Sequence, residues 1–311
     1  MSEKPEAHGR AADAAESQST LGWVGEWLGL SAPTQSKGLD KPLYGPGGAA
    51  GIKAEQVIQG DVNDCFFMAP TAAFALDNKD VISKSIQQNK DGTFTVTFAG
   101  ARDKPVTVAA PTADELKKYA QVGGGGVWPA VMEKAFGKYL KDNPAERDKI
   151  LGHTTSMGGW FLSDPQEYAD AGRAAAVFKL YTGIDPSGVR LAGDHGSSGV
   201  RDLLTQAFSG EKHSAVVAGI AKGNQTALQL GLHPEHDYTI TGYADGIVTL
   251  RDPRAKTENN ELGRHMASAN GVFTMKVDDF ARAFDEVLEA RTKPVLSGGG
   301  AIMIGRLPFR R

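Results

Sequence analysis

The spacing of hydrophobic residues divides the chain into a helix-rich first half and a strand-rich second half. In residues 127–140 (VWPAVMEKAFGKYL), apolar side chains recur at the spacing of one helical face, which predicts an amphipathic helix. Residues 237–243 (DYTITGY) and 246–251 (GIVTLR) alternate apolar and polar side chains as strands do. Ala244-Asp245 is predicted to join them in a tight hairpin. This order of elements, without an internal repeat, predicts an α+β fold of two lobes facing each other across a cleft.

Weaker patterns predict the remaining elements. Strands are expected at residues 93–99, 105–109, 214–221, 271–277 and 301–307, and helices at residues 113–121, 200–208 and 278–290. Asp278 is expected to cap the last of these helices. The glycine run at residues 123–126 lacks the flanking residues of a phosphate-binding loop, so we expect it to be a plain connection.

The first 40 residues differ in character from the rest. Residues 1–20 are polar and rich in small side chains, which predicts disorder, whereas residues 21–30 place Trp23 and Trp27 on one face of a short amphipathic helix. We expect this helix to pack on its own domain; the alternatives are that it docks a partner or covers the active-site cleft as a self-inhibitory segment. The predicted division is a tail at 1–40 and a folded domain at 41–311, with subdomains at about 41–185 and 186–311.

Charge and composition narrow the class of protein. A net charge of −3 over 311 residues, without a basic cluster, argues against nucleic acid as a partner. The single cysteine excludes an internal disulfide and fits a reducing compartment. The first 20 residues lack the apolar core of a secretory signal, and no apolar run approaches the ~18 residues of a membrane span. We expect a cytoplasmic protein, or one exported without a cleavable signal peptide.

That single cysteine, Cys65, lies in QGDVNDCFFMAPTAAFA, between an extended lead-in at residues 56–58 and an apolar, alanine-rich stretch. This layout predicts a thiol at the start of a helix, where the helix dipole favours the thiolate and Asp64 can cap the free N–H groups. Gln59 is placed to donate its amide to an oxyanion. Pro70 predicts a kink, or a helix that becomes regular only after it. The alternative is that Cys65 is a small buried hydrophobe.

A nucleophilic thiol needs a base, and the best candidate is His236, at the entrance of the predicted strand 237–243. Asp252 follows the partner strand and is placed to orient the imidazole. His213, just before another strand, is a weaker alternative. A metal site built from His233 and His236 is the least favoured reading, because no further ligand cluster accompanies them.

Six segments carry a family resemblance. They are QGDVNDCFF, AAPTADEL, VWPAVMEKAFGKYL, LYTG, HDYTITGYADGIVTLRDPR and GVFTMKVDDFARAF, and they cover about residues 57–286. In this order they resemble the protease core of the calpain family of papain-like cysteine proteases. The resemblance implies a papain-like fold, with a helix-rich N-terminal and a β-rich C-terminal subdomain and the active site between them. It makes Cys65 the nucleophile, His236 the base and acid, and Gln59 an oxyanion donor.

The sequence departs from the family at four positions near these residues. Asp252 stands where the family has Asn, and Arg254 where it has Trp. Phe66 replaces a Trp after the cysteine, and Glu235 replaces a Gly before the histidine. Asp can still orient a histidine, and it stabilises the charged imidazolium more strongly. The resemblance also allows calcium as a cofactor, although the sequence requires none.

Our main hypothesis is a calpain-like cysteine endopeptidase that cleaves a protein or peptide substrate through an acyl-thioester on Cys65, with His236, Asp252 and Gln59 as its partners. The short chain and the polar tail suggest a stand-alone enzyme of bacterial type and are compatible with a delivered effector. Two alternatives stay open. One is a deamidase or acyltransferase that uses the same residues, and the other is a catalytically silent binding module that kept the fold.

Overall fold

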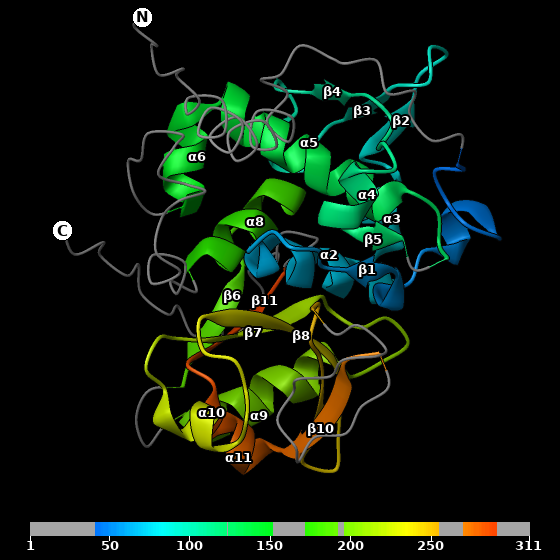
Figure 1. Cartoon of the computed structure of the whole chain (residues 1–311). Helices are drawn as coiled ribbons and strands as arrows, with labels where there is room; N and C mark the ends of the chain where they lie inside the picture. Colours follow the sequence, from blue (N-terminus) through cyan, green and yellow to red (C-terminus); the bar gives the residue numbers. More distant parts are fainter. Residues whose placement is uncertain (1–40, 123, 152–171, 192–195, 255–269, 291–311) are drawn as a thin grey trace, which may run out of the picture.

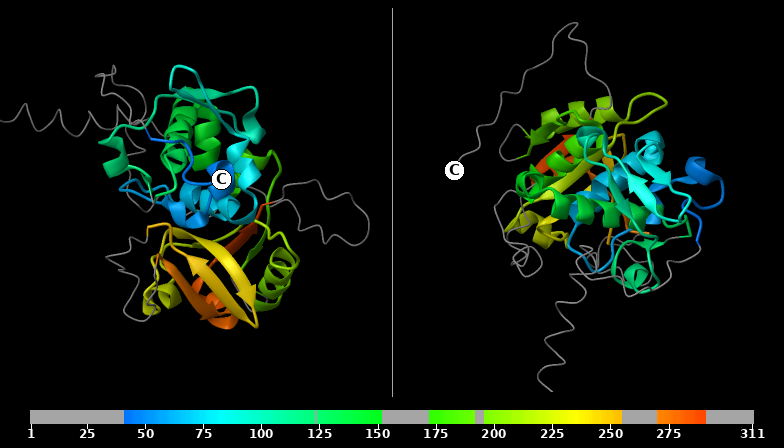
Figure 2. Two further views of the ribbon diagram at one scale, coloured as in Figure 1. Left: turned by 90° about the vertical axis from the view of Figure 1, so that its right-hand side faces the viewer. Right: turned by 90° about the horizontal axis from the view of Figure 1, so that it is seen from above.

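The computed structural model describes residues 41–122, 124–151, 172–191, 196–254 and 270–290. Within them the chain forms an α+β fold (Figure 1). The helices of the first half lie on one side, and a six-stranded sheet with α9, α10 and α11 lies on the other. Figure 2 shows the same two layers from the side. The Trp23/Trp27 segment and the predicted strand at 301–307 lie outside the described residues.

The first half is built around α2 (Cys65–Asp77). The other helical elements are η1 (Gly48–Gly51), η2 (Ala54–Gln56), α3 (Lys79–Ser83), η3 (Ala99–Ala101), α4 (Glu115–Lys118), α5 (Trp128–Asp142), α6 (Pro144–Leu151) and α8 (Gly172–Thr182). A two-stranded sheet pairs β1 (Val57–Ile58) with β5 (Gln121–Val122), and a three-stranded sheet has the order β2 (Ile86–Gln88), β3 (Phe94–Val96), β4 (Val106–Val108). Because α2 packs against helices on several sides, its residues from Cys65 to Ala75 are all buried.

Aromatic side chains fix α2 against its neighbours. The Phe67 ring stacks on Phe136 of α5 with ring centroids 4.1 Å apart. Phe74 contacts Tyr181 of α8 at a centroid distance of 5.0 Å. Such pairs add about 0.5–1.5 kcal/mol each beyond their buried area. The start of α2, where Cys65 lies, is thereby held in one position.

The second half is an antiparallel sheet in the order β10-β9-β8-β7-β11-β6. Its strands are β6 (Ser187–Arg190), β7 (Val216–Ile220), β8 (His236–Ala244), β9 (Ile247–Arg251), β10 (Val272–Lys276) and β11 (Glu286–Glu289). Its helices are α9 (Gly196–Ala207), α10 (Gln225–Gln229) and α11 (Val277–Ala283). One face of the sheet contributes Val217 and Leu288 to the core around α2, and the opposite face contributes Val216 and Val287 to a second core. Strand β7 is therefore apolar on both faces.

Most of the periodic segments form the elements that the sequence predicts. The helix at 127–140 is confirmed as α5, and its apolar face is buried. The hairpin is confirmed as β8–β9, but its turn is Asp245-Gly246, where both residues have positive φ (52° and 75°), rather than Ala244-Asp245. Two positive φ values in a two-residue loop match the twist of the flanking strands.

The helix predicted at 278–290 is wrong in its second half. Helix α11 begins at Val277 and ends at Ala283, so Asp278 is not its cap. Residues Glu286–Glu289 form β11, which pairs with β7 on one side and β6 on the other. Hydrogen bonding on both edges and burial of Val287 override the local helical pattern.

Pro70 lies inside α2, which runs from Cys65 to Asp77 as one helix. The alternative of a helix that becomes regular only after Pro70 is therefore wrong. The Thr71 hydroxyl donates to the Phe67 carbonyl at 2.8 Å. Because proline has no N–H, one helical hydrogen bond is lost, and the close packing around α2 compensates for it.

Direct hydrogen bonds join the two halves near the start of α2. The Thr239 hydroxyl of β8 donates to the Ala69 carbonyl at 2.9 Å. The Gln59 backbone N–H donates to the Pro253 carbonyl at 2.8 Å. Segments around residues 59–69 and 236–253 thus meet at one place.

Among the described residues, no helix has the length and apolar character needed to cross a membrane.

Candidate active site

Cys65 is the first residue of α2 and is 5% exposed. Its thiol is in hydrogen-bond contact with the backbone of Asp237, the residue after His236. Burial, followed by the Asp237 charge, raises the pKa of Cys65 to about 12. This direction is opposite to the one expected from the helix dipole, because loss of hydration outweighs the partial charge of the helix end. In this conformation the thiol is neutral.

Asp64 occupies the N-cap position of α2, but its side chain does not cap the helix. Its carboxyl group is instead fully buried against Glu133 of α5, and the two side chains hydrogen-bond to each other. Burial raises the pKa of Asp64 to about 7 and holds that of Glu133 well above its usual value. Loss of hydration raises both pKa values, and the hydrogen bond between the two side chains raises that of Glu133 further and lowers that of Asp64 only in part. The predicted cap is therefore replaced by a tertiary contact between α2 and α5.

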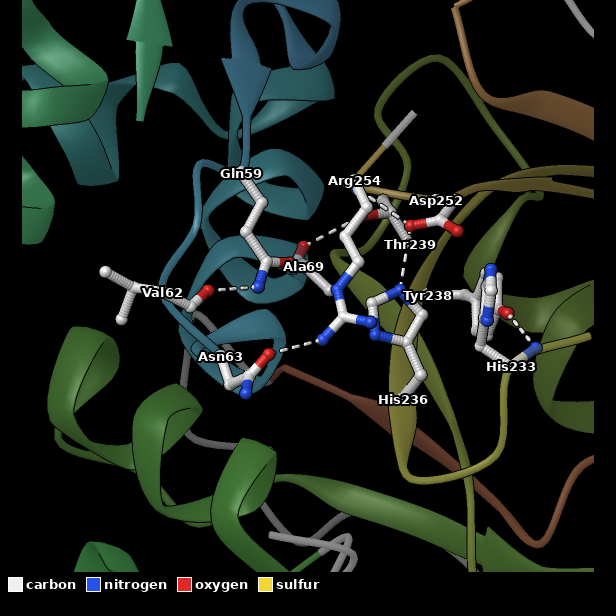
Figure 3. A network of polar contacts seen from close by, with 10 residues as sticks. All are labelled: Gln59, Val62, Asn63, Ala69, His233, His236, Tyr238, Thr239, Asp252 and Arg254. Carbon is white, nitrogen blue, oxygen red and sulfur yellow. Dashed lines mark hydrogen bonds and ion pairs between the residues drawn. The ribbon is translucent and has the colours of Figure 1, made fainter. Parts of the chain in front are cut away.

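His236 and Asp252 form a buried pair where β8 begins and β9 ends (Figure 3). His236 opens β8, and Asp252 directly follows β9, the neighbouring strand. The Nε2 atom of His236 lies 2.7 Å from Asp252 Oδ1, and the two side chains are 0% and 2% exposed. The antiparallel register of β8 and β9 brings these residues together across 16 positions of the sequence.

The protonation of this pair follows from its surroundings. Burial lowers the pKa of His236, and the nearby Asp252 charge only partly offsets this effect. Burial alone would raise the pKa of Asp252, but the charge and hydrogen bond of His236 outweigh it and bring that pKa below its ordinary value. The ionised carboxylate can only accept, so Nε2 carries the proton. The other ring nitrogen, Nδ1, is buried and has no partner among the described residues, which leaves its lone pair free to accept a proton.

Gln59 lies in the loop before α2 and is 1% exposed. Its Nε2 atom donates to the Val62 carbonyl at 2.5 Å, and its Oε1 atom has no partner within the described segments (Figure 3). A primary amide has two N–H donors, so one remains for an acceptor outside the protein. The Gln59 backbone is fixed by its bond to the Pro253 carbonyl, next to Asp252.

Arg254 and Asn63 also belong to this cluster, although the sequence pattern assigned them no role. The Arg254 backbone N–H donates to Asp252 Oδ1 at 2.8 Å. Its guanidinium extends across to Asn63 and donates to Oδ1 at 2.8 Å, as Figure 3 shows. Glu133 was likewise missed, but an acidic residue within the buried face of a predicted helix is a signal that could have identified it.

Of the other described histidines, His213 lies away from the site and His233 borders it. His213 precedes β7 and pairs with Asp77 at 2.8 Å, whereas His236 pairs with the last residue of β7, Ile220. His233 packs edge-on against His236 with ring centroids 6.1 Å apart. Within the described part of the chain, no group of three or more His, Cys, Asp or Glu side chains could hold a metal ion. Among these residues, His233 and His236 therefore have no third side chain of these types that would complete a metal site with them.

Two sequence comparisons show which known proteins this chain is similar to. Residues 45–147, which include Gln59 and Cys65, match the family model described as calpain family cysteine protease. Human calpain-14 is 24% identical over 230 residues, which cover 67% of this chain. Together the two matches support an assignment to the calpain family. It spans only 29% of the length of calpain-14, so the comparison concerns a core region shared with that relative.

The similarity to this family suggests cysteine peptidase activity, and the structure shows the physical consequences of two of the departures from the family pattern. Glu235 has a φ of 56°, in the left-handed region that favours glycine, so the family's Gly suits this backbone and Glu235 adopts it at a cost of about 1–2 kcal/mol. Asp252 keeps an acceptor 2.7 Å from His236, as the amide oxygen of an Asn would.

Proposed function

We propose that this protein is a cysteine endopeptidase with a papain-like arrangement of Cys65, His236, Asp252 and Gln59. One observation carries the proposal. His236 is buried, is held by a carboxylate through Nε2, and has no partner for Nδ1 among the residues that the structure describes. It also precedes directly the residue whose backbone contacts the only cysteine. A base in this state can remove the thiol proton.

In the first half of the reaction, His236 Nδ1 takes the proton of Cys65 Sγ as the sulfur attacks the carbonyl carbon of the scissile peptide bond. Asp252 stabilises the imidazolium that results, and the negative oxygen accepts the free N–H of Gln59 and a backbone N–H at the start of α2. The C–N bond then breaks. His236 returns the proton to the leaving amine, and the acyl group stays on Cys65 as a thioester.

In the second half, a water molecule attacks the thioester carbon while His236 accepts one of its protons. The C–S bond breaks, the carboxylic acid product leaves, and the proton returns to the sulfur. Because burial favours the neutral thiol and the neutral imidazole, we infer that proton transfer accompanies attack rather than precedes it.

Substitution of the nucleophile tests this proposal. Cys65→Ala should abolish peptide cleavage while leaving the thermal unfolding midpoint within a few degrees of the wild-type value, since Ala keeps the helix start intact. Cleavage is measured by mass spectrometry of a protein substrate, with calcium and a thiol reductant present. Ser214→Ala, a change at a half-buried position next to β7, serves as a control that should retain activity. Equal cleavage by Cys65→Ala would refute the proposal, and a mass gain of about one dalton without chain cleavage would indicate deamidation.

A further inference from the structure

Arg254 places a guanidinium at the candidate active site in a position where the family has Trp. The residue follows Asp252 by two positions, and its backbone N–H holds the same carboxylate oxygen that binds His236. Figure 3 shows its side chain extending toward the loop before α2, where it reaches Asn63, and its charge is near enough to His236 to lower the pKa of that imidazole. The guanidinium therefore bridges the segment that carries His236 and Asp252 and the segment that carries Cys65.

The charge of Arg254 has no carboxylate partner within the described residues. Its one side-chain acceptor there is Asn63 Oδ1, a neutral amide oxygen in an exposed hydrogen bond. A guanidinium has five N–H donors in a planar fork that fits a carboxylate at two points. Asp252 hydrogen-bonds to His236, and from Arg254 it accepts the backbone N–H but no side-chain N–H. The Arg254 side chain is thus a positioned cation, and most of its N–H donors have no acceptor among the described residues.

The position of Arg254 relative to His236 indicates which part of a substrate it meets. His236 must reach the amine nitrogen that leaves when the peptide bond breaks. A group near the His236 ring, on the loop that carries its orienting carboxylate, borders the substrate residue that contributes this nitrogen. Because the Arg254–Asn63 bond is exposed, the side chain of that substrate residue can reach the guanidinium from solvent.

We propose that Arg254 selects substrates with an acidic side chain immediately after the scissile bond. The carboxylate of that Asp or Glu displaces Asn63 and binds the guanidinium at two points. The inference rests on the proposed function and adds a substrate class to it. A purely structural role, in which Arg254 only ties the loop after Asp252 to Asn63, predicts no dependence on substrate charge.

The experiment digests a mixed peptide library of defined composition with the full chain and identifies the new N-terminal residues by mass spectrometry. Wild type should enrich Asp and Glu at that position by about tenfold over Asn and Gln, the size expected for a charge-assisted hydrogen bond. Arg254→Gln should abolish the enrichment while cleavage continues, and Arg254→Glu should shift the preference to Lys and Arg. Arg201→Gln, which alters an exposed arginine paired with Asp278, should keep the wild-type preference.

A binding measurement separates failure of this inference from failure of the proposed function. Fluorescence anisotropy titrations compare how Cys65→Ala binds two labelled peptide pools, one with Asp and Glu and one with Asn and Gln in their place. The acidic pool should bind more tightly. The double variant Cys65→Ala/Arg254→Gln should bind the two pools equally. Cleavage without acidic preference, or a preference that survives Arg254→Gln, would overturn the inference alone. Absence of cleavage with Arg254-dependent acidic binding would overturn the proposed endopeptidase and retain the recognition role. Absence of both would overturn both.

Discussion

The ionised Asp252 distinguishes this site at the residue scale. A neutral Asn, the family's residue at this position, would hold the imidazole by a hydrogen bond alone, whereas the carboxylate also raises the pKa of His236. Burial acts in the opposite direction and prevails, so His236 is neutral and able to accept a proton. The carboxylate thus offsets part of the cost of forming a buried imidazolium during the reaction.

Asp252→Asn separates charge from orientation. The variant keeps an oxygen acceptor for Nε2 but loses the charge that raises the pKa of His236, so the acidic limb of the kcat/KM–pH profile should shift to lower pH. Asp252→Ala also loses the hydrogen bond and should lower kcat/KM by about 10²-fold or more. An acidic limb that shifts upward, or equal losses in the two variants, would contradict the role assigned to Asp252.

At the scale of elements, a buried carboxyl pair sets the position of α2. Asp64 directly precedes Cys65, and Glu133 of α5 also accepts the Ala120 backbone N–H at 2.6 Å. Two carboxyl groups out of water are stable only while they retain protons. Each then holds its proton in the folded protein at a pH where the unfolded chain has released it, so the stability that the pair contributes is lost as pH rises.

Glu133→Gln tests this linkage. The pKa of Asp64 is raised to about 7 and that of Glu133 lies well above its ordinary value, so the wild-type free energy of unfolding should fall as pH rises from about 5 to 8. The variant removes one titrating group, and its curve should be flatter by up to about 1.4 kcal/mol per pH unit. Denaturant titrations at several pH values measure this. Asp142→Asn, at an exposed carboxylate on the same helix, should leave the slope unchanged, and parallel curves for Glu133→Gln would refute the linkage.

At the scale of the whole molecule, the candidate site exists only where the two halves meet. Gln59 and Cys65 come from the first half, and His236, Asp252 and Arg254 from the second. Hydrogen bonds cross between the halves close to these residues, including those from Thr239 to Ala69, Gln59 to Pro253 and Arg254 to Asn63. The relative placement of nucleophile and base therefore depends on this contact.

Thr239→Val removes one crossing bond without changing side-chain volume. Thr239 is fully buried, so loss of its bond to the Ala69 carbonyl should lower the free energy of unfolding by about 1 kcal/mol. We expect kcat to fall as well, because misplacement of the two halves weakens catalysis. Thr107→Val, at an exposed threonine pair on β4, is the matched control and should have little effect on either quantity. Equal behaviour of the two variants would show that Thr239 does not align the halves.

Local sequence patterns predict the helices, turns and hairpins that depend on residues a few positions apart. Helix α5 and the β8–β9 hairpin follow from local periodicity and turn residues, and a cysteine at a helix start follows from the polar residues before an apolar run. The proximity of His236 to Asp252 was also predictable, because a hairpin brings its two ends together.

Strand β11, the side-chain contacts between distant residues and the pKa shifts follow only from the folded structure, because they depend on burial and on charges far apart in the sequence. Residues Glu286–Glu289 became a strand because a position between β7 and β6 was open to them. Asp64 turned from the helix end to Glu133, the pKa of Cys65 rose instead of falling, and Arg254 reached Asn63. Desolvation and charge pairing are set by groups that folding brings together from far apart in the sequence, and local patterns do not report them.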